Sequence, residues 1–234
     1  MAPRPQLSLC VHVSADRDLI QEFSENVIGF FQKFPLLYEV LFAVNPGQDQ
    51  SLSLLRYLAE RNPHYKIVEN KKHLSRAQNL ENLCKESRGD ILITTDLDLA
   101  APLSEIFKML EVFYSERETE VVFGDRTKAK KKLETTEAEE IPLETFFSGV
   151  IREKTAWPYQ DLFCPILGIR KSAFEKIQND LKSSGWHWNH EVQRVVHRLQ
   201  LKSREVPLYV GSRKIQKPPK TEALQLLKFV LFRI

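Results

Sequence analysis

The sequence is poor in the residues that build metal clusters, disulfide frameworks and membrane spans. Its 234 residues include three cysteines, Cys10, Cys84 and Cys164, with no Cys-x-x-Cys pair and no histidines paired at metal-ligand spacing. Zinc sites and disulfide frameworks are therefore both disfavoured. No apolar run reaches the roughly 18 residues of a transmembrane helix, and the first residues lack the apolar core of a signal peptide. We therefore expect a cytoplasmic protein.

Neither basic nor acidic residues are in large excess. The 34 basic and 31 acidic residues leave a formal charge of +3, and no stripe of Arg and Lys is interleaved with aromatic residues. This balance argues against a nucleic-acid partner but permits an anionic substrate. The content of 42% hydrophobic and 28% charged residues is typical of a folded globular chain, which we read as one large domain.

The first hundred residues contain an alternation of strand-like and helix-like patterns. This alternation predicts an α/β fold with a doubly wound, mostly parallel sheet flanked by helices. Because neither a Gly-x-Gly-x-x-Gly turn nor a Gly-Lys-Ser/Thr loop is present, the dinucleotide-binding and P-loop versions are disfavoured. The expected strands are 7–13, 38–44, 65–69 and 91–95, and the expected helices are 19–35, 51–61 and 74–87.

The second half is less regular. We expect a strand at 121–126 that leaves the core, and an exposed, mobile insertion at 127–140, where four lysines give way to four glutamates. This insertion is either a solvated charged loop or a lid whose lysines meet a phosphate. The remaining expectations are helices at 103–114, 143–152, 170–181 and 191–199, an apolar run at 162–169, a strand at 204–210 and a basic turn at 211–214.

Two carboxylates follow the fourth expected strand. Asp96 and Asp98 stand two residues apart, where the apolar run ends. In open α/β sheets ligands bind at the carboxyl ends of the strands, and two acids there can hold a divalent cation that neutralises a diphosphate. The alternative is a strand-terminating turn with solvated acids, since Asp-x-Asp is common by accident.

Histidines and tryptophans gather just before the last expected helix. The spacing of His187, His190 and His197 does not match a metal site, so we expect core tryptophans and surface histidines. Glu191 lies in the first turn of this helix, where it could act as a base or orient an acceptor. Its alternative role is that of a partner for the helix dipole.

The order of these signals resembles a known family. The segments Asp-Leu-Asp-Leu-x-x-Pro at 96–102, Val-Val-Phe-Gly-Asp-Arg at 121–126, Asp-Leu-Phe-Cys at 161–164, Trp-Asn-His-Glu at 188–191 and Glu-Val-Pro at 205–207 together resemble family-2 glycosyltransferases. The similarity is greatest to polyprenyl-phosphate sugar transferases of the dolichol-phosphate mannose or glucose synthase type. It implies the Rossmann-like glycosyltransferase A fold, a nucleoside-diphosphate sugar as donor, and Mg²⁺ or Mn²⁺.

The resemblance also implies roles for individual residues. Asp98, in the Asp-x-Asp motif, would ligate the metal, and Asp98, Asp161 and Glu191 would form the catalytic set. The residues that match the nucleotide-sugar site are Asp16, with Asp18 as its alternative, Asn45, Arg76, Asn79 and Asp96. The residues that match the acceptor-phosphate site are Arg126, Arg213 and Lys214.

Several family positions carry other residue types. The first strand ends in His12-Val13 instead of a Pro-x-Tyr-Asn-Glu-like turn, and the second ends in Asn45 instead of paired aspartates, although an asparagine can still hydrogen-bond a nucleobase. Ala100 replaces a glutamine, and Pro165-Ile166 replaces Gly-Phe. Two functions therefore remain: an inverting transferase acting on a lipid-phosphate or glycan acceptor, or a catalytically inactive sugar-nucleotide-binding or scaffold protein. A nucleotidyltransferase would need a glycine-rich basic loop after the first strand, which is missing.

The domain organisation follows from these matches. Residues 1–220 form one transferase-like domain, with a nucleotide-binding half at 1–102 and an acceptor half at 103–220. Residues 221–234 read as an amphipathic helix with an apolar stripe that includes Leu224, Leu227 and Leu231. Such a helix can lie in a bilayer interface and bring the site to a polyprenyl-phosphate acceptor at the inner face of the membrane. The alternative is a helix packed on the domain or on another subunit.

Liposome flotation tests the membrane alternative. The full chain should float with vesicles, whereas a chain ending at Lys220 should not, because the apolar stripe is the part that enters the interface. If both chains float equally, or neither does, the prediction is wrong.

Overall fold

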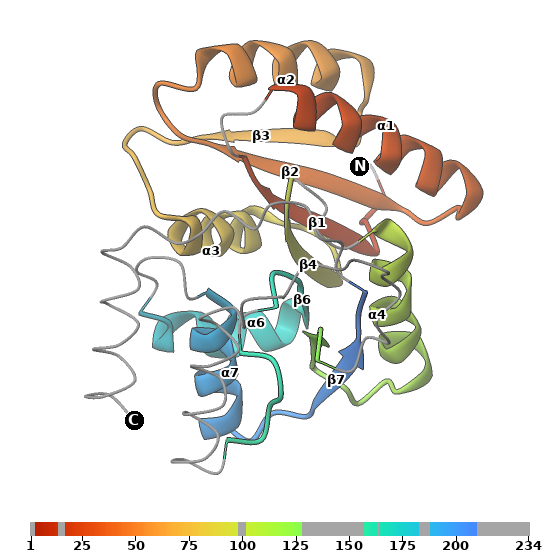
Figure 1. The fold of residues 1–234 in the computed structure, drawn as a ribbon, viewed down its shortest axis with the longest axis vertical. Coiled ribbons are helices and arrows are strands. Elements are labelled where there is room, and N and C mark those ends of the chain that lie inside the picture. The colour runs from red at the N-terminus through yellow and green to blue at the C-terminus, as the bar shows by residue number, and fades with distance from the viewer. Residues whose placement is uncertain are drawn as a thin grey trace, which may run out of the picture.

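The structure is a computed structural model that describes residues 3–13, 17–97, 102–127, 157–162, 164–182 and 188–209. Within these ranges seven strands form one sheet in the order β3-β2-β1-β4-β6-β5-β7 (Figure 1). The strands are β1 (Leu7–His12), β2 (Tyr38–Val44), β3 (Tyr65–Glu69), β4 (Ile91–Asp96), β5 (Val121–Asp125), β6 (Leu167–Arg170) and β7 (Ser203–Pro207). The helices are α1 (Arg17–Lys33), α2 (Asp49–Arg61), α3 (Arg76–Glu86), α4 (Leu103–Ser115), α6 (Lys171–Ile177), α7 (Trp188–Arg198) and the short 3₁₀ helix η1 (Gln178–Asp180).

The first four strands are parallel, so their carboxyl ends meet at one edge of the sheet. β1 pairs with β2 on one side and with β4 on the other, and His12 lies opposite both Ala43 and Asp96. The chain runs outward from β1 to β2 and β3 and then returns to β4. The junction between β1 and β4 is therefore the topological switch point, where open α/β sheets bind their ligands.

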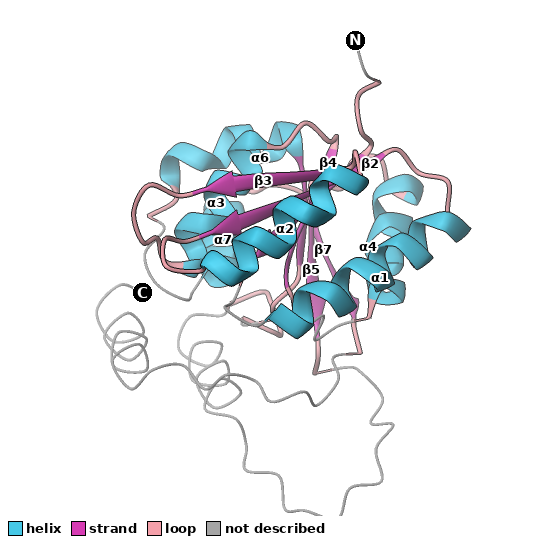
Figure 2. Cartoon of the chain, turned by 90° about the horizontal axis from the view of Figure 1, so that it is seen from above, coloured by secondary structure: helices cyan, strands magenta, loops and turns pink. Residues whose placement is uncertain are grey.

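Helices cover both faces of the sheet (Figure 2), so the strands are buried on both sides and read as nearly continuous apolar runs. Leu9 and Val11 of β1 pack with α1, α2 and α4 in one core cluster. Cys10, whose side chain points to the opposite face, packs with α3, α6 and α7 in a second cluster. The doubly wound, mostly parallel fold predicted from the sequence is confirmed.

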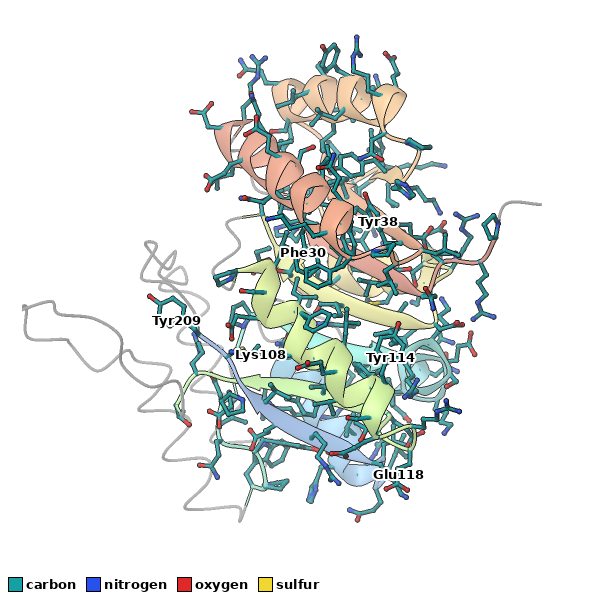
Figure 3. The ribbon with its side chains drawn as sticks, turned by 90° about the vertical axis from the view of Figure 1, so that its right-hand side faces the viewer. Phe30, Tyr38, Lys108, Tyr114, Glu118 and Tyr209 are labelled. Atoms are coloured by element: carbon teal, nitrogen blue, oxygen red, sulfur yellow. The ribbon has the colours of Figure 1, made fainter. Side chains whose placement is uncertain are left out.

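One prediction is wrong for the part of the sheet formed by β6, β5 and β7. The strand expected at 121–126 does not leave the core: all five residues of β5 are buried, and β5 lies between β6 and β7. β6 is antiparallel to both β4 and β5, and so joins the two halves in one sheet. Beyond β7, the Tyr209 N–H donates to Glu105 of α4, which also holds Lys108, and this end of the chain is thereby fixed on α4 (Figure 3).

Helix ends follow local sequence more closely than the periodicity alone suggested. α3 begins at Arg76 because Ser75 caps it: the Ser75 hydroxyl accepts from the Gln78 N–H, and the Gln78 side chain accepts from the Ser75 N–H. The helix expected at 170–181 is shorter, with α6 followed by η1, and α7 begins three residues before the expected 191. The insertion at 127–140 beyond Thr127, the helix at 143–152, the turn at 211–214 and the tail at 221–234 lie outside the described residues.

No helix in the described part of the chain is both long enough and apolar enough to cross a membrane.

Two glycines should respond in opposite ways to alanine. A Cβ on Gly89 would lie 2.6 Å from the backbone nitrogen of Ser8, whereas a Cβ on Gly29, inside α1, would meet nothing within 4 Å. Gly89→Ala should lower the free energy of unfolding by about 1–3 kcal/mol through overpacking. Gly29→Ala should raise it by about 0.5–1 kcal/mol, since alanine loses less backbone entropy in a helix. Urea denaturation of both variants measures the pair, and equal effects would contradict the packing at Gly89.

Candidate active site

A buried ion pair stands at the switch point. Asp96 ends β4, and Arg76 begins α3 directly above it. The guanidinium holds the carboxylate with two nitrogens, Nε to Oδ1 at 2.9 Å and Nη2 to Oδ2 at 2.8 Å. The side chains are 7% and 22% exposed. This two-pronged geometry fixes both groups, and Nη2 also reaches the carbonyl oxygen of Pro165 at 3.4 Å, in the second half of the chain.

Three asparagines form a network beside this pair. The Asn45 side chain, at the end of β2, bonds the backbone of Leu74 twice: its amide donates to the Leu74 carbonyl at 2.9 Å, and its Oδ1 accepts from the Leu74 N–H at 3.1 Å. Asn70, which follows β3, donates from Nδ2 to both Asn45 Oδ1 and Asn79 Oδ1. Asn45 therefore braces the loop between β3 and α3. The sequence reasoning missed Asn70, although its position just after a parallel strand places it at the ligand edge.

His12 is the second site residue that the sequence reasoning passed over. Its Nδ1 lies 3.1 Å from Asn79 Nδ2. Burial lowers the pKa of His12 from 6.5 to about 4; Asp96 opposes this shift, while Arg76 and His73 add to it. His12 is therefore neutral at physiological pH.

A second polar cluster surrounds Asp161, in the second half of the chain. Asp161 is buried and receives Arg126 at three points: the backbone N–H at 3.0 Å, Nε at 2.6 Å and Nη2 at 2.9 Å. The Gln193 amide of α7 donates to the Asp161 carbonyl at 2.9 Å. Glu205 of β7 accepts from the Gln160 N–H at 2.6 Å. These bonds fasten the segment 157–162 to β7, to α7 and to Arg126, the residue that follows β5.

Glu191 lies in the first turn of α7, and its carboxylate is hydrogen-bonded to neighbouring residues. Its carboxylate accepts from Arg194 Nη2 at 2.7 Å and from the Lys182 N–H at 3.0 Å. Burial raises the pKa of Glu191, but the bonds to Arg194 and Lys182 outweigh it, so the pKa is lowered overall and the group is ionised at neutral pH.

The histidines of this region only partly match the sequence prediction. Trp188 is fully buried and His197 is exposed, as expected. His190, expected at the surface, is 3% exposed, and its ring centroid lies 5.2 Å from that of Trp157. The prediction failed for His190 because residue 157, distant in sequence, covers it. His187 lies outside the described residues.

The structure brings together most of the predicted site residues that it describes. Asn45, Arg76, Asn79 and Asp96 share the switch-point edge, and Arg126 contacts Asp161. The backbone of 164–165 links the two halves, because Arg76 reaches the Pro165 carbonyl and the Asn189 amide of α7 donates to the Cys164 carbonyl. Glu191, on α7, bonds to Arg194 and Lys182 and to none of these site residues in the described contacts. Asp16, Asp98, Arg213 and Lys214 lie outside the described residues.

The fit of a divalent metal depends on Asp98. No group of three His, Cys, Asp or Glu side chains is arranged as a metal site in the described ranges. Both carboxylate oxygens of Asp96 accept from Arg76, so Asp96 is already neutralised. Asp98 follows two residues after the end of β4, and its carboxylate is of the ligand type that Mg²⁺ and Mn²⁺ prefer.

The buried neutral His12 predicts an acid-sensitive step in stability. Below pH 6.5 the unfolded chain gains a proton on this residue, but the folded chain does not until about pH 4. Stability should therefore fall across this window, by roughly 3 kcal/mol from the difference in pKa. His12→Gln should remove this part of the slope in urea denaturation measured from pH 7 to pH 4. An unchanged slope would contradict the burial effect.

The sequence and the fold are similar to those of known proteins. The model of the family described as glycosyl transferase family 2 matches residues 10–178. Glycosyltransferase AglD of Haloferax volcanii is 22% identical over 171 residues, which are 73% of this chain and 27% of that protein. The chain thus spans about a quarter of the length of this curated relative.

Solved structures share the fold. A mannosyltransferase of Pyrobaculum calidifontis, in complex with GDP-Man and Mn²⁺, superposes with a TM-score of 0.61 at 15% identity over 99% of this chain and 71% of that one. Glucosyl-3-phosphoglycerate synthase of Mycobacterium tuberculosis, in complex with phosphoglyceric acid, gives 0.67 at 12% identity over 97% of this chain and 79% of that one. At such identities the likeness shows the fold. Because the family model matches residues 10–178, which are well over half of the sequence, the chain belongs to glycosyl transferase family 2.

Proposed function

We propose that the chain transfers a sugar from a nucleoside-diphosphate sugar to an acceptor, assisted by Mg²⁺ or Mn²⁺. The observation that carries this proposal is the Arg76–Asp96 pair at the switch point, with Asp98 two residues further along. Family membership supports it. So do structural relatives that hold GDP-Man with Mn²⁺, and UDP-glucose with Mn²⁺ and phosphoglyceric acid.

The donor would lie across the ends of β1, β2 and β4. Asp96, fixed by Arg76, would contact the ribose or base, and Asn79 would line the nucleoside pocket from α3. Asn45 would act through the loop that it braces, since its Oδ1 and amide already bond Leu74. Asp16, in the segment after β1, completes the proposed donor set. Asp98 would hold the metal, which when bound neutralises charge on the departing diphosphate.

The state of the two acceptor-half carboxylates favours a phosphate acceptor. Asp161 is held by Arg126, and Glu191 by Arg194. The bonds to Arg194 and to the Lys182 N–H outweigh burial and lower the pKa of the Glu191 carboxyl, which makes it a poor proton acceptor. Both carboxylate oxygens of Asp161 already accept hydrogen bonds from Arg126. A hydroxyl acceptor, as on a glycan, needs a general base, whereas a phosphate oxygen is already anionic.

The acceptor we propose is therefore a lipid phosphate of the polyprenyl type. Its oxygen would attack the anomeric carbon as the bond to the diphosphate breaks, which inverts the configuration at that carbon. Arg126, Arg213 and Lys214 would attract the acceptor phosphate.

Asp98→Asn tests the catalytic proposal. Wild type should bind nucleoside diphosphates more tightly with Mn²⁺ than without it in calorimetry, and Asp98→Asn should abolish this metal dependence, because an amide cannot replace the charge of the carboxylate. Asp96→Asn should weaken binding less, since Asp96 would contact the ribose or base and would not ligate the metal.

The matched control is Asp90→Asn, at the residue just before the amino end of β4. Asp90 is 59% exposed and pairs with Arg4 at 2.8 Å, so its loss should leave nucleotide binding unchanged. Metal-independent binding that survives Asp98→Asn would reject the transferase proposal and favour a catalytically inactive sugar-nucleotide-binding protein of the same fold.

A further inference from the structure

Large hydrophobic side chains are exposed around the end of α1. Within the described ranges six such side chains are 37–51% exposed, and four of them belong to α1, α2 and the turn between α1 and β2. Contiguous apolar surface of this kind, rimmed by polar residues, marks an interaction site in a folded chain. The four residues, which with Phe30 and Phe107 make up what we call the apolar patch, are Ile28, Phe34, Leu37 and Tyr57.

Aromatic contacts join the patch into one surface. The ring centroid of Phe34 lies 4.9 Å from those of Phe30 and of Phe107 on α4. Phe30 in turn contacts Phe31, which stacks on Tyr38 with the centroids 3.8 Å apart. Phe30 and Tyr38 lie on the side of the molecule seen in Figure 3. The patch therefore runs from α4 across the end of α1 to the start of β2.

The same patch contains a hollow and an exposed apolar side chain next to it. A groove of about 510 Å³ lies between α1 and α2, and Ile28 and Arg61 are among the residues that line it. The Arg61 guanidinium lies 3.6 Å from the centre of the Tyr57 ring, which connects Tyr57 to the groove. Leu37 is 46% exposed beside the groove, because the next residue, Tyr38, lines it. A surface that holds both shapes can fit a copy of itself, since each subunit of a two-fold dimer offers the same patch.

Charges of both signs surround the patch. Lys33 precedes Phe34, and Glu111 lies one helical turn after Phe107 on α4. Both side chains are exposed, and neither has an ion-pair partner among the described residues. Glu60, exposed on α2, adds a second acid. An anionic membrane would favour a basic rim, whereas opposite charges in one patch can pair with those of a second copy.

We infer that the apolar patch is the interface of a homodimer, in which Leu37 of each copy enters the groove of the other and Lys33 pairs with Glu111 of the other copy. In such a two-fold contact each pairing occurs twice. The groove lies at the amino ends of the strands, since Tyr38 begins β2, whereas Asp96 ends β4 at the opposite edge. The ligand edge of each copy therefore stays open, and the inference does not rest on the proposed function.

Light scattering during size-exclusion chromatography tests the interface. Wild type should have twice the mass of one chain at micromolar concentrations. Leu37→Glu should raise the dissociation constant of the dimer by roughly thirtyfold or more, because its carboxylate would be buried without a partner. Leu199→Glu is the matched control: Leu199 is 40% exposed and follows α7, outside the patch, so this variant should remain a dimer.

Three results would overturn the inference. They are a monomeric wild type, a dimer that survives Leu37→Glu, and equal loss of the dimer in both leucine variants. If the wild type is monomeric but binds vesicles of phosphatidylglycerol, and Leu37→Glu abolishes that binding, the patch is a membrane surface instead.

A charge exchange tests the two-fold pairing without a change in the apolar surface. Lys33→Glu and Glu111→Lys each bring like charges together, so each should weaken the dimer by about fivefold. The double variant should recover the wild-type affinity, because every pair is then inverted. Both side chains are exposed, so these variants keep the fold even if Leu37→Glu does not. Single variants with unchanged affinity, or a double variant as weak as the singles, would contradict the interface.

Discussion

The ion pair between Arg76 and Asp96 is the interaction on which the ligand edge depends. It joins the first residue of α3 to the last residue of β4, and Arg76 also reaches the Pro165 carbonyl in the second half of the chain. Both side chains are mostly buried, so loss of either partner would leave a charge poorly solvated and unpaired. The Ser75–Gln78 capping box and the Asn45 brace hold the backbone that presents Arg76, and the pair therefore forms on a preorganised loop.

The fold explains why the polar groups gather at one place. Strands buried on both faces must be apolar along their length, so side chains that bind polar ligands are confined to the strand ends. Parallel pairing of β1, β2 and β4 then gathers His12, Asn45 and Asp96 at a single edge. β6 extends this sheet in the antiparallel sense and brings the segment that carries Asp161 beside the nucleotide half.

Sequence alone predicted the elements well where local chemistry bounds them. The strands 38–44 and 65–69 were predicted with their observed ends, because turns close them on both sides. The place of β5 in the sheet and the burial of His190 were not predictable, since each depends on partners distant in the chain. The same limit applies to the site: the residue type of Asn45 suggested a base contact, but its partner Leu74 lies 29 residues away.

The electrostatics of the ligand edge follow from neutral groups as much as from charged ones. Asn45, Asn70, Asn79 and neutral His12 carry polarity without net charge, and Arg76 with Asp96 forms a pair that sums to zero. An acid in place of Asn45 would repel an incoming diphosphate, and it could not donate to the Leu74 carbonyl as the Asn45 amide does. Amide polarity can therefore orient a nucleoside where further carboxylates would oppose the phosphates. In the proposed reaction, the charge of the diphosphate would then be balanced by the metal and by the basic residues assigned to the acceptor.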